Sequence, residues 1–202
     1  MNIHYVTLEA PDSAAADAFY SSVFGLGDRV RVRTTEAPTT GFRGFTLSAI
    51  VSQPATVDSF VDAAAEAGAT TIKPAEKSLW GYGAVVQAPD GAIWQVATSN
   101  KKNTGPATRE IDEVVLLLAA EDVAASKRFY VDRGLTVGKS FGKYVDFAMP
   151  SSPVKLGLYT RRALAKTAGV DPEGSGSHRI VIGGGSESFT DPDGFEWESA
   201  PA

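Results

Sequence analysis

Cysteine is absent from this 202-residue chain, which excludes disulfide bonds, thiolate metal ligands and cysteine nucleophiles. Long hydrophobic runs are also absent: the longest purely apolar segment, residues 114–120, is far shorter than the roughly 20 residues that a membrane-spanning helix needs. Charge of one sign is not in large excess, since 19 basic and 24 acidic residues give a net charge of −5. This balance argues against nucleic acid or an anionic membrane as the main partner.

What the chain contains is typical of a folded globular protein. Hydrophobic residues make up 43% and charged residues 21% of the sequence, which is far from the composition of a disordered chain. The length is enough for one large domain or two small ones, each with a real core. The first residues lack the basic and apolar regions of a signal peptide, so we expect a cytoplasmic protein.

An internal repeat organises the chain. Each half opens with a strand-like segment, continues with an alanine-rich segment, and closes with a tight turn before a last strand. The repeated features are a Phe-Tyr pair (Phe19-Tyr20 and Phe129-Tyr130), a Gly-Leu pair (25–26 and 134–135) and a Pro-Asp-Gly turn (89–91 and 192–194). We therefore predict two domains, 1–98 and 109–202, joined by a linker over 99–108 that is rich in Asn, Lys, Gly and Pro.

The hydrophobic patterns alternate between strand and helix in both halves and predict an α+β fold. In the first half we expect strands over 3–9, 28–34, 43–52, 82–87 and 93–97, and helices over 13–25 and 54–67. In the second half we expect strands over 111–118, 136–141, 143–149, 154–159, 178–182, 186–190 and 195–199, and helices over 122–132 and 160–168.

This order of elements resembles the vicinal oxygen chelate superfamily, the group of glyoxalases, bleomycin-resistance proteins and extradiol dioxygenases. The resemblance covers most of the chain and implies repeated βαβββ modules, whose curved mixed sheets form a cup around a ligand or metal, with helices on the outer face. The first half lacks the two strands that usually follow residue 34, and the second half lacks the helix that matches 57–67. We expect the helix at 160–168 or another subunit to cover the exposed sheet face.

The resemblance also implies metal-ligand positions on the first and last strands of the modules. In the second half these positions hold Glu113, His178 and Glu198. One imidazole with two carboxylates would suit Fe²⁺, Mn²⁺ or Co²⁺ better than a soft ion. Glu198 is in addition the implied catalytic residue, because a ligating glutamate of a glyoxalase-like protein exchanges protons with the substrate.

The corresponding positions of the first half hold Tyr5, Thr46 and Gln95. These side chains are neutral and do not compensate the charge of an ion, so we expect this half to have lost its metal site. A fourth position falls near Gly157, which has no side chain to offer.

Strand alternation predicts which side chains line the cup, because residues two apart share a face. Leu117 would share the face of Glu113, and Ile180 that of His178, while Trp94 and Trp197 would pack outward against helices. The result would be an apolar cup with a few polar groups at its floor, typical of a small-molecule site. The predicted ligand-contact residues are Leu117, Tyr159, Ile180, Tyr5, Thr46, Gln95 and Trp80.

Three functions stay open on this basis. The first is an enzyme, a lyase, isomerase or dioxygenase that holds one divalent ion through Glu113, His178 and Glu198. The second is a metal-free protein that binds a small molecule or sequesters an antibiotic. The third is a structural or regulatory module whose cup is filled by its own side chains.

The expected partner is a small-molecule ligand or substrate in each of the first two cases. A nucleotide cofactor is not expected, because the glycines at 183–185 open no helix. Exposed sheet edges of the trimmed modules favour a homodimer. The sequence leaves open whether the modules pair within one chain or across a dimer.

Overall fold

The computed structural model describes residues 1–200. The first half forms β1 (Ile3–Ala10), α1 (Ser13–Val23), the 3₁₀ turn η1 (Gly27–Arg29), β2 (Val30–Thr34), β3 (Thr39–Gly41), β4 (Phe45–Ile50), α2 (Pro54–Glu66), β5 (Thr70–Ser78), β6 (Gly81–Gln87) and β7 (Ile93–Thr98). The second half forms β8 (Glu113–Ala120), α3 (Val123–Asp132), β9 (Val137–Phe141), β10 (Tyr144–Phe147), β11 (Val154–Thr160), α4 (Arg161–Ala168), β12 (Gly174–Gly176), β13 (Ile180–Gly184), β14 (Phe189–Thr190) and β15 (Glu196–Glu198).

Matching residues begin the repeated helices. The Asp12 carboxylate accepts a hydrogen bond from the backbone N–H of Ala15 at 2.9 Å and caps α1, and Asp122 accepts from Ala124 in the same way at α3. Such caps satisfy backbone donors that have no partner inside the helix. The repeat seen in the sequence is therefore also a repeat of local structure.

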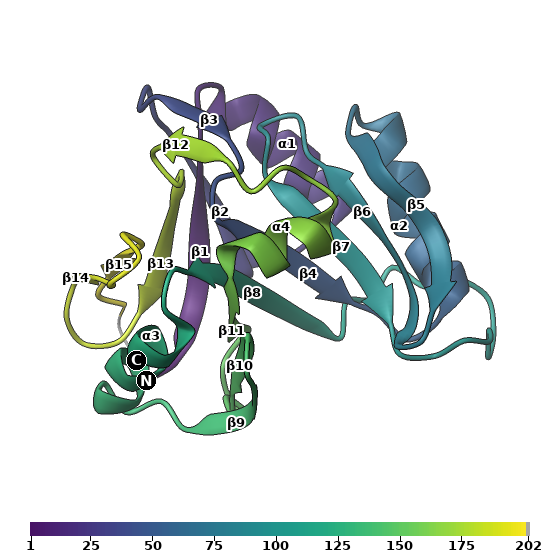
Figure 1. Ribbon diagram of the computed structural model, residues 1–202. Coiled ribbons are helices and arrows are strands. Elements are labelled where there is room, and N and C mark those ends of the chain that lie inside the picture. The colour runs from purple at the N-terminus through teal and green to yellow at the C-terminus, as the bar shows by residue number, and fades with distance from the viewer. Residues whose placement is uncertain (201–202) are drawn as a thin grey trace.

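Apart from β3 and β12, which pair antiparallel in a separate two-stranded sheet, all strands form one mixed sheet (Figure 1). Its main order is β14-β15-β13-β1-β11-β8-β4-β7-β6-β5. Strand β1 pairs antiparallel with β13, and β4 pairs antiparallel with β8 in the equivalent way. The modules of the two halves therefore pair with each other within one chain.

One face of the sheet, here called the outer face, carries α1, α2 and α3. Its core contains Trp94 and Trp197 on the closing strands, and Tyr20 and Tyr130 on the repeated helices. This confirms the prediction that the two tryptophans pack outward against the helices. Alternation holds along β8 as predicted, because Val114, Leu116 and Leu118 belong to this core.

The opposite, inner face carries α4, which lies across the sheet in front of β4 and β8 in Figure 1. A second apolar cluster forms there between the helix and the sheet. Its buried members are Phe42, Val85, Ile93, Leu117, Ala119, Leu164, Ala165 and Ala168. The segment at 160–168 was expected to cover the face left open by the helix missing from the last module, but α4 packs instead on the inner face, against β4, β8 and β11.

Strand β5 is absent from the sequence predictions. Its residues are mostly polar and exposed, it contains Pro74, and its pairing with β6 has two register shifts. Hydrophobic and polar residues do not alternate in such a segment, so it gives no strand signal. The segment can form a strand because β5 lies at the edge of the sheet, where proline is tolerated. Among residues 1–200, no helix has the length and apolar character needed to cross a membrane.

Candidate functional site

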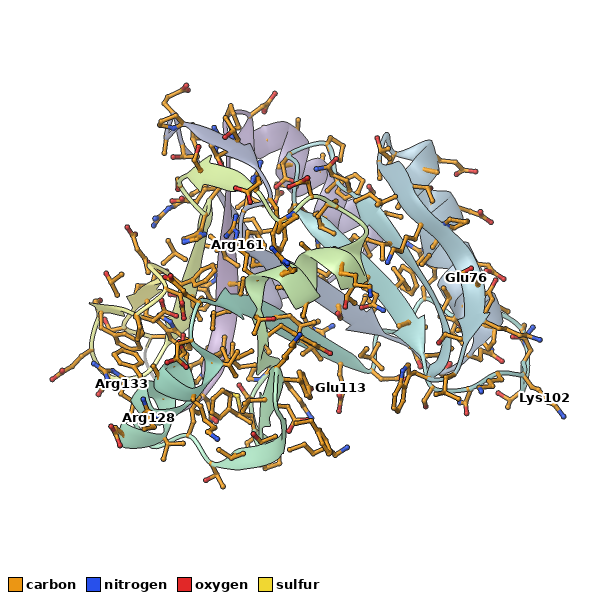
Figure 2. The ribbon with its side chains drawn as sticks, viewed as in Figure 1. Glu76, Lys102, Glu113, Arg128, Arg133 and Arg161 are labelled. Atoms are coloured by element: carbon orange, nitrogen blue, oxygen red, sulfur yellow. The ribbon has the colours of Figure 1, made fainter. Side chains whose placement is uncertain are left out.

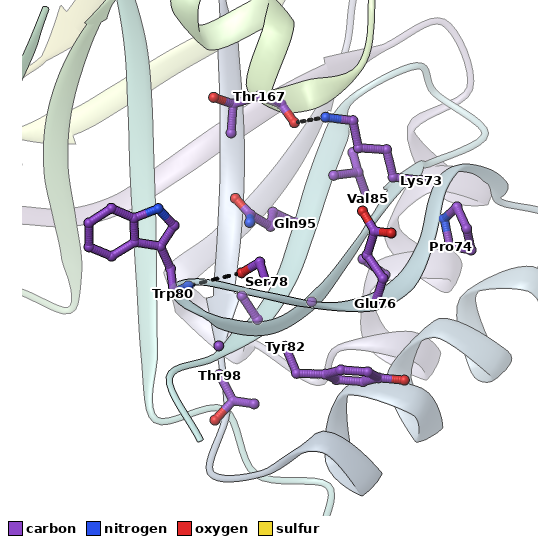
Figure 3. Close-up of a pocket in the computed structure, with 14 residues that line it drawn as sticks. Lys73, Pro74, Glu76, Ser78, Trp80, Tyr82, Val85, Gln95, Thr98 and Thr167 are labelled. Carbon is purple, nitrogen blue, oxygen red and sulfur yellow. Dashed lines mark hydrogen bonds between the residues drawn. The ribbon is translucent and has the colours of Figure 1, made fainter. Parts of the chain in front are cut away.

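A pocket of about 220 Å³ opens on the inner face between α4 and strands β5, β6 and β7 (Figure 3). We call it the α4 pocket. It is smaller than the roughly 300–1,000 Å³ of sites for drug-sized molecules, so it suits a smaller ligand. Its lining residues are Lys73, Pro74, Glu76, Ser78, Trp80, Gly81, Tyr82, Gly83, Ala84, Val85, Gln95, Ala97, Thr98 and Thr167.

Gln95 and Trp80 are the two lining residues that the sequence predicted. Figure 3 shows Gln95 rising from β7 in the middle of the lining residues, with Trp80 to one side at the tip of the β5–β6 hairpin. The Gln95 side chain makes no hydrogen bond to any residue within 1–200. Trp80 is 84% exposed. The pocket lining therefore includes an amide with a free donor and acceptor and, at one side, an exposed aromatic ring.

Lys73 joins the pocket wall to α4. Its ammonium donates hydrogen bonds to the carbonyl oxygens of Thr167 at 2.7 Å and Lys166 at 3.0 Å. These are carbonyls of the last helical turn, where the helix carries partial negative charge. Glu76 is the one carboxylate among the lining residues, and it forms no ion pair within the described chain.

Helix α4 covers the part of the inner face beside the pocket, over β4, β8 and β11. Leu164 and Ala165 are fully buried in the apolar cluster. The Arg161 guanidinium fastens the first turn by donating to the carbonyl oxygens of Pro172, at 2.7 Å, and Phe42. Leu117 and Tyr159, two predicted ligand contacts, pack in this cluster. Leu117 is therefore covered by the chain itself, whereas Tyr159 is half-buried, and this burial raises its pKa.

The structure does not bring the predicted metal ligands together. Glu113, labelled in Figure 2, is exposed at the start of β8. It forms an ion pair with Lys155 at 2.8 Å. Glu198 lies on β15, and β13, β1 and β11 separate it from β8. Four strand spacings of about 4.8 Å place the two glutamates about 19 Å apart along the sheet.

His178 lies in a third place, before the start of β13. Its Nδ1 faces the carbonyl oxygen of Arg43 at 2.5 Å, its Nε2 faces that of Asp193 at 3.2 Å, and the ring stacks on Phe195 at 4.0 Å. Both ring nitrogens are therefore directed at backbone. Within residues 1–200 no group of three His, Cys, Asp or Glu side chains could hold a metal ion. The prediction that Glu113, His178 and Glu198 meet at one site is wrong.

The remaining predicted contacts divide between the two faces. Ile180 belongs to the outer core with Ile182, so the prediction that it lines the cup is wrong. Thr46 is buried on β4, opposite Leu117 of β8. Tyr5 is buried on β1, away from the α4 pocket, opposite Gly183 of β13.

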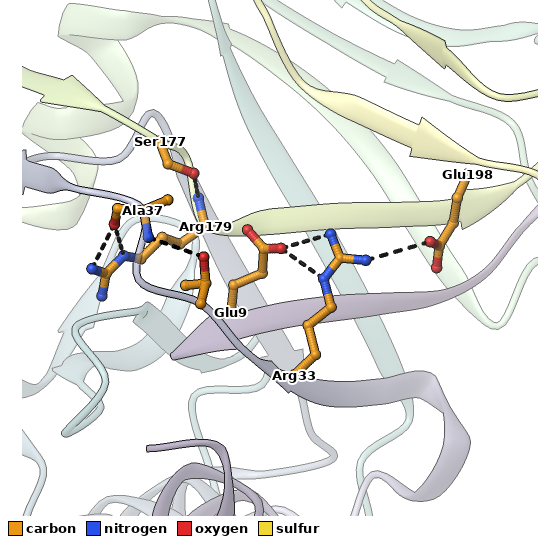
Figure 4. Close-up of polar contacts among 7 residues, drawn as sticks. Glu9, Arg33, Ala37, Ser177, Arg179 and Glu198 are labelled. Atoms are coloured by element: carbon orange, nitrogen blue, oxygen red, sulfur yellow. Dashed lines mark hydrogen bonds and ion pairs between the residues drawn. The ribbon is translucent and has the colours of Figure 1, made fainter. Parts of the chain in front are cut away.

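A second polar group lies on the inner face of β1, β2 and β15, and we call it the Arg33 cluster (Figure 4). The Arg33 guanidinium contacts Glu9 at 2.6 Å and Glu198 at 3.7 Å. Next to it, the Arg31 guanidinium stacks on the Tyr5 ring at 3.5 Å. Burial, together with a hydrogen bond and the negative charge of Glu198, raises the pKa of Tyr5.

No protein-family model matches the sequence, and no curated protein matches it either. Solved structures do match. A variant of glyoxalase I from Zea mays superposes with a TM-score of 0.63 and 15% identity, over 98% of this chain and 91% of that one. Glyoxalase I from the same species gives a TM-score of 0.61 with 14% identity over 97% and 90% of the two chains. A candidate dioxygenase from Bacillus subtilis gives 0.58 with 12% identity over 96% and 72%.

The chain has the fold of glyoxalase I. At this level of identity the likeness establishes the architecture, and one fold supports many activities. Whether this chain can hold a metal ion depends on the residues at the corresponding positions.

The metal positions that the sequence resemblance implied do not hold a metal-binding set in this chain. The repeat can be aligned on its Phe-Tyr pairs. Phe19 lies 14 residues after Tyr5, and the residue that lies 14 before Phe129 is Val115. Val115, and not Glu113, is therefore the equivalent of Tyr5. The pairing of β13 with β1 places Val181, not His178, where Thr46 lies on β4. Two first-strand positions are therefore valines, which offer no metal ligand.

Sequence reasoning missed the part of the α4 pocket that β5 supplies, including Lys73 and Glu76. The cause is the missed strand, because polar residues without alternation gave no signal of a wall. No sequence signal indicated Thr167, and its backbone contact with Lys73 places it at the rim.

Proposed function

We propose that this protein binds a small planar molecule in the α4 pocket without the help of a metal. The observation that carries the proposal is the Gln95 amide, which faces the pocket with its donor and acceptor unused. Gln95 also occupies a position that the superfamily uses to reach a ligand. The pocket lining includes one carboxylate and no histidine, a set that suits an organic ligand better than a divalent ion.

The side chains of Gln95 and Trp80 indicate which chemical groups this ligand should carry. An amide group pairs best with a ligand edge that offers one acceptor and one donor side by side, as a primary amide or lactam does. The exposed indole of Trp80 provides a surface for stacking a flat ring. The volume of about 220 Å³ limits the ligand to one or two fused rings. A small aromatic amide fits all three conditions.

Trp80 also provides the readout. Of the three tryptophans, Trp94 and Trp197 are buried and Trp80 is exposed, so changes in accessible tryptophan fluorescence report on the pocket. Titration with benzamide and 2-naphthamide in the presence of EDTA should quench this fluorescence to saturation. Gln95→Leu keeps the size of the side chain and should weaken binding about tenfold, because the ligand amide loses its partner.

Leu79 offers the matched control. It precedes Trp80 on the same hairpin, is similarly exposed, and does not line the pocket. With binding followed by calorimetry, Trp80→Ala should lose most of the affinity and Leu79→Ala should retain it. Equal effects of the two substitutions, or binding that appears only after a divalent metal is added, would overturn the proposal.

A further inference from the structure

The Arg33 cluster places a cation between two acidic side chains from distant parts of the chain. Arg33 Nε and Nη2 donate to Glu9 Oε1 at 2.7 and 2.6 Å, and Nη1 lies 3.7 Å from Glu198 Oε2. Figure 4 shows the guanidinium between the two carboxylates. The Glu9 side chain is 12% exposed, against 46% for Arg33 and 36% for Glu198. The pair with Glu9 is therefore the better shielded of the two contacts.

Strand pairing fixes this arrangement. Arg33 lies opposite Glu9 in the parallel pair of β2 and β1, and Glu198 lies opposite Gly183, which in turn lies opposite Tyr5. In the repeat, Glu198 follows the second Pro-Asp-Gly turn exactly as Gln95 follows the first. Glu198 therefore occupies a last-strand position of the kind from which the superfamily binds metal.

We propose that the Arg33 guanidinium takes the place of a metal ion on this inner face. Two carboxylates near each other repel unless a cation lies between them, and a guanidinium supplies positive charge with several directed donors. Arg33 thus supplies at Glu198 the positive charge that an ion would supply, and it links the first strands of the chain to its last strand.

Arg31 provides a matched control for testing this role. It lies two residues before Arg33 on the same strand and face, is also exposed, and stacks on Tyr5 without an ion pair among residues 1–200. Arg33→Gln and Arg31→Gln therefore make the same change in charge. Only the first leaves Glu9 and Glu198 without their shared cation.

The experiment is a calorimetric titration of EDTA-treated protein with Mn²⁺ and Zn²⁺, with melting temperature measured alongside. The wild type and Arg31→Gln should bind either ion only weakly, without saturation in the range titrated. Arg33→Gln should show a saturable site with a dissociation constant roughly tenfold or more below the highest metal concentration used, and its melting temperature should rise with the metal. Adding Glu198→Gln to Arg33→Gln should abolish this gain, and Arg33→Lys should not show it.

Two outcomes would overturn the inference. One is stoichiometric binding of either ion by the wild-type protein, which needs no variant to observe. The other is a response of Arg33→Gln equal to that of Arg31→Gln. Neither result bears on amide binding in the α4 pocket, which lies on other strands, so the two proposals fail independently.

Discussion

The Lys73 ammonium donates a 2.7 Å hydrogen bond to the carbonyl oxygen of Thr167, and this contact fastens α4 to the edge strand of the sheet. A second bond to the Lys166 carbonyl strengthens it. Gly169 follows the helix with φ 82°, and a Cβ at this position would lie 2.6 Å from the Lys73 side chain. The end of the helix is thus seated directly on β5, at the rim of the α4 pocket.

Loss of this contact should loosen the helix. In Lys73→Met the aliphatic stem remains but the charged donor is lost, and we expect the unfolding free energy to fall by about 1 kcal/mol. Amide hydrogen exchange in α4 should accelerate more than exchange elsewhere. Lys77→Met is the control, because Lys77 is exposed on the same strand and its side chain makes no hydrogen bond within residues 1–200. Equal exchange in the two variants would contradict the role of Lys73.

Leu164 should carry most of the packing of α4. Its side chain is fully buried between the helix and the sheet. Truncation to alanine removes apolar contacts and leaves a cavity, so Leu164→Ala should lower the unfolding free energy by about 2–4 kcal/mol in chemical denaturation. Arg162→Ala, on the exposed side of the same helix, should change it by less than about 0.5 kcal/mol. Similar losses in both variants would show that the helix contributes little to the core.

Much of the fold follows from sequence because local signals agree with the tertiary structure. The Asp12 and Asp122 caps, the buried faces of α1 and α3, and the turn at 89–91 each specify an element locally. The sequence did not predict strand β5, because this strand is stabilised by pairing with β6 and by contact with α4. A pattern of hydrophobic residues along the segment does not reveal such interactions.

The candidate site was less predictable for a different reason. Glu113 lies two residues before Val115, the position that matches Tyr5. Because residues two apart share a face of the strand, the face predicted for Glu113 was correct although the position was wrong. His178 lies before β13, outside the strand that carries the equivalent position. Counting from the Phe-Tyr pair would have identified Val115. The role of Arg33 depends on side-chain contacts between β1, β2 and β15, and no sequence motif indicates these.

Asp191 should make stability depend on pH. It is buried, and it accepts hydrogen bonds from the Tyr130 hydroxyl at 2.5 Å and the Phe195 backbone N–H at 2.8 Å. Burial raises its pKa above the usual 3.8, although these hydrogen bonds oppose the shift. The folded state therefore binds this proton more tightly than the unfolded state does. Its contribution to stability is present at low pH and is lost as pH rises from about 4 through the raised pKa.

Asp191→Asn removes the titration and keeps an oxygen for the backbone donors. The difference in unfolding free energy between wild type and variant should change with pH only between about 4 and the raised pKa, and should be flat above it. Urea unfolding at a series of pH values measures this difference, and NMR titration of the carboxyl gives the pKa directly. A difference that does not vary with pH would mean that the Asp191 pKa is not raised.

Substitution of Gly183 should destabilise the protein, because the Tyr5 ring occupies the space that any larger side chain would need. A Cβ at this position would lie 2.3 Å from two atoms of the ring, which is held on its other side by Arg31. Gly183→Ala should therefore displace the ring and lower the unfolding free energy by about 1–3 kcal/mol. Combining it with Tyr5→Ser should cost less than the sum of the two single changes, because the clash is gone. Gly105→Ala is the control, since nothing lies within 4 Å of a Cβ there. Strict additivity of the Gly183 and Tyr5 changes in denaturant unfolding would show that the ring is free to move aside.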